Sequence, residues 1–158
     1  TNGTIPDMVE KLVEHQPTQL YISTYGCNKE MHQRTANPIT PDAWERLQKS
    51  LSMMNKFNRN VMRLTLVRGF NFMDPEGYAE LIEKYRPMFV EPKGFSFVGH
   101  SQERLEVNNM PYHHEILEFA KRIEENSSYK VIDSKEESRV ALLVREDFEG
   151  RKMEFEEL

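Results

Sequence analysis

The stretch LYISTYGCNKEMHQRT, residues 20–35, decides the fold because it joins two kinds of pattern. Its first residues alternate between apolar and polar side chains, and this period of two predicts a β-strand over residues 19–24. A polar loop follows and leads into a short helix. A strand followed directly by a helix is the unit of a parallel sheet with helices packed outside it.

The same order recurs along the chain. Strands are predicted over residues 60–69 and 88–99, and residues 129–134 and 138–145 are predicted to pair as a C-terminal β-hairpin. Proline suits the first turn of a helix, and it marks four predicted starts: Pro6 after Thr4 as a cap, Pro41 after Thr40, Pro75 after Asp74, and Pro111. We therefore predict an α/β protein in the form of a partial TIM-like barrel.

Composition restricts the class of protein. The chain has 158 residues, 30% of them charged, and a net charge of -5, which suits one domain with its own core. No apolar run is long enough to cross a membrane, and the negative charge argues against a chain-wide nucleic-acid surface while leaving a local basic patch open. The single cysteine, Cys27, indicates a reducing compartment, so we expect a cytoplasmic location.

In a barrel, functional residues lie at the carboxyl ends of the strands. Ser23 and Thr24 end the first predicted strand, and their hydroxyls can bind a ribose, a carboxylate or a phosphate. The alternative is that they only cap the helix that follows.

The second predicted strand places Arg63, Thr65 and Val67 on one face. An inward arginine needs an anionic partner, which is either a ligand or Glu91 on the next strand. Glu91 shares a face with Lys93, and such a pair can move protons, position a substrate or form a plain salt bridge.

Four separated stretches carry a resemblance to a known family: PTQLYISTY (17–25), RLTLVRGFN (63–71), VEPKGFSFVGHSQERL (90–105) and MPYHHEILEFAKRI (110–123). They resemble the radical-SAM enzymes of wybutosine biosynthesis, the 4-demethylwyosine synthases, which act on tRNA. The opening TNGT resembles the exit of the third strand in the same family. The resemblance extends from residue 1 to about residue 145.

The resemblance implies a (β/α)6 partial barrel, of which residues 1–126 are the C-terminal half and residues 127–158 an appended β-hairpin and tail. It implies 4Fe–4S clusters, S-adenosylmethionine, pyruvate, and N1-methylguanosine in tRNA as the substrate, with the product 4-demethylwyosine. It also implies two sets of site residues. The cofactor-binding set is Asn2, Ser23, Thr24, Arg63, Thr65 and Val67, and the substrate-binding set is Lys29, Arg34, Glu91, Lys93, Ser101 and Arg104.

The chain departs from the family in one large respect. The CxxxCxxC motif that binds the cluster is absent, and Cys27 is no substitute for it. We therefore expect a fragment that lacks the N-terminal half of the barrel, is inactive alone and leaves an open sheet edge beside Leu20 and Ile22.

Two other functions stay open. One is a radical-SAM enzyme with a substrate other than RNA, and the other is a non-catalytic α/β module that binds a small anion. We also predict that the acidic tail, with Glu154, Glu156 and Glu157, is solvated.

Overall fold

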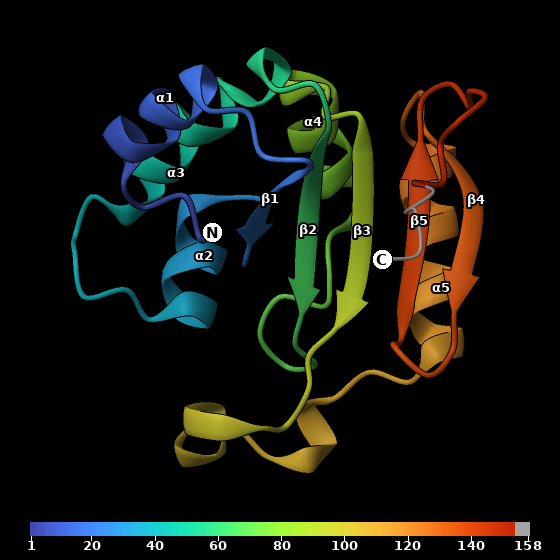
Figure 1. Ribbon diagram of the computed structural model, residues 1–158. Helices are drawn as coiled ribbons and strands as arrows, with labels where there is room; N and C mark the ends of the chain where they lie inside the picture. The colour runs from blue at the N-terminus through green and yellow to red at the C-terminus, as the bar shows by residue number, and fades with distance from the viewer. Residues whose placement is uncertain (154–158) are drawn as a thin grey trace, which may run out of the picture.

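The computed structural model describes residues 1–153, which form a mixed five-stranded sheet with helices packed against it (Figure 1). The five strands are β1 (Leu20–Thr24), β2 (Asn60–Leu66), β3 (Phe89–Gly94), β4 (Lys130–Lys135) and β5 (Val140–Val144). The five α-helices are α1 (Pro6–Glu14), α2 (Lys29–Ala36), α3 (Ala43–Leu51), α4 (Pro75–Tyr85) and α5 (His113–Glu125). Short 3-10 turns lie at Met54–Lys56, Gly99–Glu103 and Val107–Asn109.

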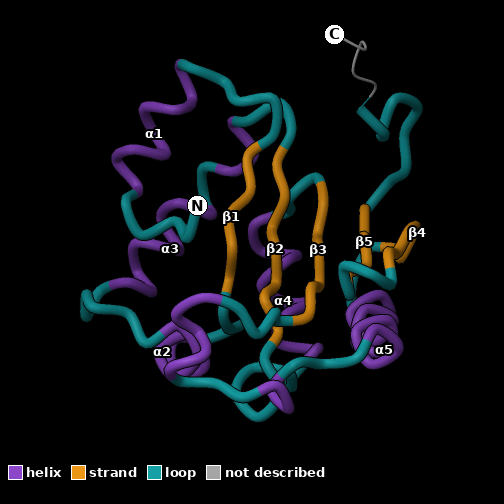
Figure 2. Tube along the Cα trace, turned by 60° about the horizontal axis from the view of Figure 1, so that its bottom comes forward, coloured by secondary structure: helices purple, strands orange, loops and turns teal. Residues whose placement is uncertain are grey.

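The strand order across the sheet is β1-β2-β3-β5-β4. The first three strands are parallel, as the alternation of strands and helices predicted, and β5 runs antiparallel to β3. The predicted C-terminal hairpin is confirmed, because β4 and β5 pair antiparallel with a bulge between Val131 and Asp133. Figure 2 shows β1, β2 and β3 side by side, with the hairpin beyond β3 and α5 next to it.

The two faces of the sheet differ in character. One face is covered by all five α-helices and forms the main core, in which Ile22, Met62 and Val90 of the strands are fully buried. Fully burying a side chain of this size contributes about 1.5–3 kcal/mol to stability. On the opposite face, the described residues form a smaller apolar cluster around Val61 and Phe89. Ser23, Arg63, Glu91 and Lys93 on that face are polar and partly exposed.

Helix starts follow the sequence patterns only in part. Asp74 caps α4 as predicted, since its Oδ1 accepts from the amide of Gly77 at 3.0 Å. The predicted Thr4 cap is wrong: Ile5 is the N-cap of α1, and the Thr4 hydroxyl donates instead to Asn2 Oδ1 at 2.8 Å.

Two other helices begin later than predicted. Proline does start α1 and α4, at Pro6 and Pro75, but the chain after Pro41 turns before α3 begins at Ala43. The chain after Pro111 is extended until α5 begins at His113, because Tyr112 adopts extended backbone angles as the N-cap.

The outer edge of β1 is occupied by the first residue of the chain. The Thr1 ammonium donates to Tyr21 O at 3.0 Å, and the Ser23 amide donates to Thr1 O at 2.9 Å. The edge predicted to be open beside Leu20 and Ile22 therefore has hydrogen bonds at Tyr21 and Ser23.

No helix in the described part of the chain is long and apolar enough to cross a membrane. The acidic tail predicted to be solvated, with Glu154, Glu156 and Glu157, lies outside the described residues.

Candidate functional site

A cavity of about 290 Å³ lies at the carboxyl ends of the three parallel strands. Tyr25, Val67 and Phe95 line it, and each of these residues directly follows one of the three strands. The walls are completed by α2 with the segment behind it, by the first residues of the chain and by residues 101–105. This is the end of a parallel α/β sheet at which ligands bind.

Five of the residues predicted from the sequence line this cavity: Asn2, Thr65, Val67, Ser101 and Arg104. Arg104 bonds across the wall, since its guanidinium donates to Thr35 O at 3.5 Å. The Ser101 hydroxyl donates to Val98 O at 2.6 Å and so closes the turn that carries Arg104. The structure brings these five together although Asn2 and Arg104 lie 102 positions apart in the chain.

A second group of predicted residues lies on the polar face of the sheet. Arg63 donates to Glu91 Oε2 through Nε at 3.0 Å and through Nη2 at 2.8 Å. Tyr21 donates its hydroxyl to Glu91 Oε1 at 3.1 Å, and the guanidinium lies 4.4 Å from the centre of the Tyr21 ring. Burial and the neighbouring Glu91 charge raise the pKa of Tyr21. The sequence left either a ligand or Glu91 as the anionic partner of Arg63. In the structure, Glu91 is a partner of Arg63.

Lys93 shares the polar face with Glu91, as predicted, but it does not pair with that carboxylate. Its ammonium donates to Ser138 O at 2.8 Å, in the turn of the hairpin. Burial, and then the charge of Arg63, lower the pKa of Lys93. Among the described residues, Glu91 forms its ion pair with Arg63.

Ser23 and Thr24 point to opposite faces of β1. Ser23 is partly exposed and lies opposite Arg63 in the strand register, on the polar face. Thr24 is fully buried on the helix side, where its hydroxyl donates to Arg63 O at 3.2 Å. The two hydroxyls predicted to act together are separated because successive side chains on a strand alternate between faces.

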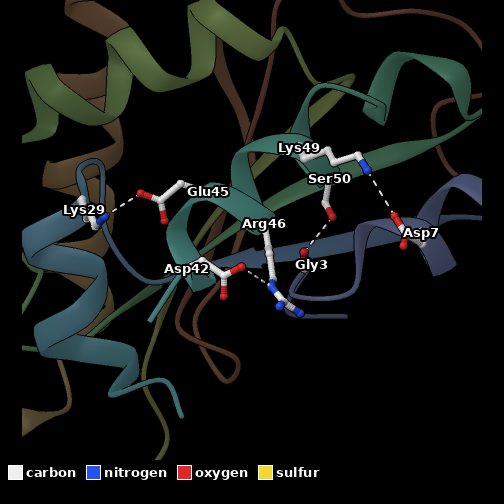
Figure 3. Close-up of polar contacts among 8 residues, drawn as sticks. All are labelled: Gly3, Asp7, Lys29, Asp42, Glu45, Arg46, Lys49 and Ser50. Carbon is white, nitrogen blue, oxygen red and sulfur yellow. Dashed lines mark hydrogen bonds and ion pairs between the residues drawn. The ribbon is translucent and has the colours of Figure 1, made fainter. Parts of the chain in front are cut away.

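Lys29 and Arg34 lie on α2 and hold it against its neighbours. The Lys29 ammonium is 2.5 Å from Glu45 Oε1 on α3, and Figure 3 shows it pointing toward that carboxylate. Arg34 donates to Phe70 O in the loop after β2. Figure 3 also shows the Ser50 hydroxyl donating to Gly3 O at 2.7 Å, which fixes the start of the chain against α3.

His32 and Thr35 are polar residues of the cavity wall that were not among the site residues predicted from the sequence. His32 is only 2% exposed, and within the described chain neither ring nitrogen has a hydrogen-bond partner. The buried Thr35 hydroxyl is also without a partner there. His32 and Thr35 are three residues apart on α2, so they lie on one face of the helix. This spacing is the sequence signal that could have identified them. Burial lowers the pKa of His32, which favours the neutral imidazole.

Local backbone features set the position of His32. Asn28 caps α2 because its Oδ1 accepts from the Met31 amide at 2.9 Å. A Cβ on Gly26 would lie 2.4 Å from His32 N, so only glycine lets the loop after β1 pass this close to α2. The imidazole then lies between aromatic rings, with centroids 6.2 Å from Tyr25 and 5.5 Å from Trp44.

Asn71 ties together two strand ends beneath the cavity. Its side-chain amide donates to Tyr25 O at 3.0 Å and to Thr65 O at 2.7 Å, while Oδ1 accepts from the Val67 amide at 2.6 Å. The side chain is completely buried, so its polar atoms depend on these partners. Asn71 thereby fixes the geometry of three cavity-lining residues.

The described residues do not fit an iron–sulfur cluster. Residues 1–153 contain no group of three or more histidine, cysteine, aspartate or glutamate side chains placed to hold a metal ion. Cys27 donates to Asp74 Oδ2 at 3.2 Å, and burial together with Asp74 raises its pKa to about 12. A cluster ligand must be a thiolate, and this site favours the thiol.

The fold and the cavity together indicate the class of protein. This is an α/β protein with a cavity at the carboxyl ends of its parallel strands, the place where α/β enzymes bind their ligands. The family model described as "Wyosine base formation" matches residues 84–145. The chain is 45% identical to the S-adenosyl-L-methionine-dependent tRNA 4-demethylwyosine synthase of Pyrococcus abyssi, over 93% of this chain and 44% of that protein.

Two further relatives agree. The enzyme of the same name from Pyrococcus horikoshii is 46% identical, again over 93% of this chain and 44% of its own length. A solved structure of TYW1 with a lysine–pyruvate adduct bound superposes with a TM-score of 0.81 at 38% identity, over 92% of this chain and 45% of that one. By sequence and fold the chain is a homologue of the radical-SAM tRNA 4-demethylwyosine synthases, as predicted. It spans less than half the length of these relatives.

Proposed function

We propose that this chain is the C-terminal part of a 4-demethylwyosine synthase, which converts N1-methylguanosine in tRNA with pyruvate and S-adenosylmethionine. The observation that carries the proposal is 45% identity to such an enzyme over 93% of this chain. The cavity at the strand ends supports it, because that is where a barrel enzyme places its reaction.

The proposed architecture is the C-terminal half of a six-unit partial barrel. Three parallel strands, each followed by helical segments, support this proposal. The outer edge of β1 supports a further strand beside it, since Thr1 bonds there to Tyr21 and Ser23 in the way a neighbouring strand would. In this proposal residues 1–126 belong to the barrel, and residues 127–158 are the hairpin and tail attached to it.

The proposed cofactors are divided between the two halves. The cluster, which supplies electrons for the cleavage of S-adenosylmethionine, would be held by the part of the enzyme that precedes this chain, since Cys27 alone does not fit it. This chain alone is then inactive. Pyruvate is proposed as a substrate because the similar TYW1 structure holds a lysine–pyruvate adduct.

The proposed site residues fall into three groups by position. Asn2, Thr65 and Val67 would contact the cofactor in the cavity that also contains the proposed substrate contacts Ser101 and Arg104. The polar sheet face would line the barrel interior, and its members are Ser23, Arg63, Glu91 and Lys93. Lys29 and Arg34 would lie toward the tRNA, and Thr24 would contribute only through its backbone because its hydroxyl is buried.

An anaerobic assay of the full-length protein tests this function. The protein, reconstituted with iron and sulfide, is given S-adenosylmethionine, pyruvate, a reductant and tRNA containing N1-methylguanosine, and the tRNA nucleosides are analysed by mass spectrometry. We expect the mass of 4-demethylwyosine from the full-length protein and none from residues 1–158 alone. Cleavage of S-adenosylmethionine without modified tRNA would favour a radical-SAM enzyme with another substrate.

The anion-binding module is the weaker alternative. Its main candidate, Arg63, already has a carboxylate partner in Glu91, so the pair has little net charge to offer a free anion. The cytoplasmic location rests on cysteine content and stays a prediction.

A further inference from the structure

We propose that His32 and Thr35 hydrogen-bond the edge of a neutral purine base that lies in the cavity at the strand ends. This inference rests on the proposed function, which supplies two purines: the adenine of S-adenosylmethionine and the guanine-derived base of tRNA. It adds two base-binding residues on α2, a helix to which the sequence assigned only Lys29 and Arg34.

Two side chains of the cavity wall have buried polar atoms without a hydrogen-bond partner in the described residues. Buried polar groups in proteins are nearly always hydrogen-bonded, because an unpaired one loses its hydration without compensation. Within residues 1–153, His32 nevertheless has both ring nitrogens unpaired at 2% exposure, and Thr35 has its hydroxyl unpaired one helical turn later. Both side chains line the same cavity. Three buried atoms without partners in residues 1–153 thus belong to two neighbouring residues of one cavity wall, and a polar molecule bound there would supply the missing hydrogen bonds.

These atoms offer both hydrogen-bond donors and acceptors. A neutral imidazole presents one donor and one acceptor, and a hydroxyl presents both. The edge of a purine likewise presents donors and acceptors side by side, such as N6–H and N7 of adenine. Burial favours the neutral form of His32. The pair on α2 therefore matches a neutral heterocycle better than it matches a phosphate or a carboxylate.

The rest of the cavity lining includes aromatic, apolar and charged side chains. Tyr25, Phe95, Val67 and Leu105 supply aromatic and apolar surface, and Arg104 is the charged side chain of the set. The described lining contains no carboxylate, which disfavours a metal ion. A mostly apolar cavity with a few polar groups is typical of a site for a flat organic ring.

The test uses the full-length protein with the variants His32→Phe and Thr35→Val. Phenylalanine keeps an aromatic ring between Tyr25 and Trp44 but removes both nitrogens, and valine keeps the shape of threonine without its hydroxyl. The matched controls are His15→Phe and Thr40→Val, which change the same side chains at positions outside the cavity lining. Circular dichroism checks that each variant is folded.

Two binding measurements separate the two sources of the base. Calorimetry measures the affinity for S-adenosylhomocysteine, and fluorescence anisotropy measures the affinity for an anticodon stem-loop. We expect both cavity variants to weaken binding of the same ligand by about 10-fold or more, while the controls leave it unchanged. His32→Gln, which keeps a donor and an acceptor, should recover part of the affinity.

The outcomes distinguish this inference from the function on which it rests. A wild-type protein that binds neither ligand contradicts the proposed function. A wild-type protein that binds both, with Thr35→Val and His32→Phe binding equally well, overturns the inference and assigns the unpaired atoms to ordered water. Equal weakening of both ligands without recovery by His32→Gln also overturns it, because that pattern reports general damage. Should His32→Phe not fold, Thr35→Val decides alone.

Discussion

Arg63 and Glu91 face each other on neighbouring parallel strands, 28 residues apart in the chain, with 2.8 Å between Nη2 and Oε2. The pair is only partly exposed, at 33% for the arginine side chain and 15% for the glutamate. It connects β2 to β3 on the polar face of the sheet, and the Tyr21 hydroxyl extends the connection to β1. One charged pair thus joins all three parallel strands.

Replacing Arg63 by leucine should lower the free energy of unfolding by about 1–3 kcal/mol, because it leaves the Glu91 carboxylate partly buried without its cation. Urea unfolding of the chain measures the change. The control is Arg122→Leu, which breaks the exposed pair between Arg122 and Glu76 and should change stability little. An Arg63 variant as stable as wild type would show that the pair does not support the sheet.

Replacing Asn71 by alanine should cost about 2–4 kcal/mol of stability, because three hydrogen bonds at the strand ends are lost in a buried setting. It should also weaken ligand binding in the full-length protein, since Tyr25, Thr65 and Val67 then lose their common partner. Thermal and urea unfolding give the first value. Asn108→Ala is the control, because Asn108 is exposed. Equal stability of the two variants would contradict the role given to Asn71.

Stability should fall as the pH drops below about 6.5, the ordinary pKa of histidine. Burial lowers the pKa of His32 in the folded chain, so the unfolded chain takes up the proton first and is favoured. The loss begins near pH 6.5 and continues until the pH reaches the folded pKa. The facing groups Tyr25, Trp44 and Arg104 supply no negative charge to offset it.

Urea unfolding between pH 8 and pH 5 tests this dependence. His32→Phe should reduce the slope of stability against pH in the acid range, whereas His15→Phe, at an exposed position, should leave it as in wild type. The same slope in the His32 variant as in wild type would assign the dependence to other groups.

The Cys27 thiol should react slowly with a maleimide at pH 8. Its pKa of about 12, against an ordinary value of 9.0, reduces the thiolate fraction by about 1000-fold. Ellman-type or mass-spectrometric labelling measures the reaction rate of the thiol in the folded chain and in the urea-unfolded chain. Asp74→Asn removes the neighbouring charge and should speed the folded reaction. Equal rates in folded and unfolded wild type would contradict the raised pKa.

A second test concerns iron. Cys27→Ser in the full-length protein should leave the iron content per protein unchanged, because the thiol is bonded to Asp74 and directed into the helix layer. Loss of iron in this variant would make Cys27 a cluster ligand.

The sequence by itself determined what depends on local pattern. Alternation along residues 20–24 and 60–66 predicted parallel strands, Pro6 and Pro75 predicted two helix starts, and Asp74 before Pro75 predicted a capped start. The family resemblance also followed from separated stretches of sequence. These local predictions hold in the structure because backbone geometry and hydrophobic burial act on residues close in the chain.

Only the tertiary structure decided which polar side chains meet. The sequence left Arg63 with two possible partners, grouped Thr24 with Ser23 and passed over His32 and Thr35. All three outcomes depend on how the elements pack. Arg63 pairs with Glu91 across 28 residues, one of two adjacent hydroxyls is buried, and His32 lacks partners in the described chain. Hydrogen-bond satisfaction is a property of three-dimensional neighbours, and no periodicity in the chain encodes it.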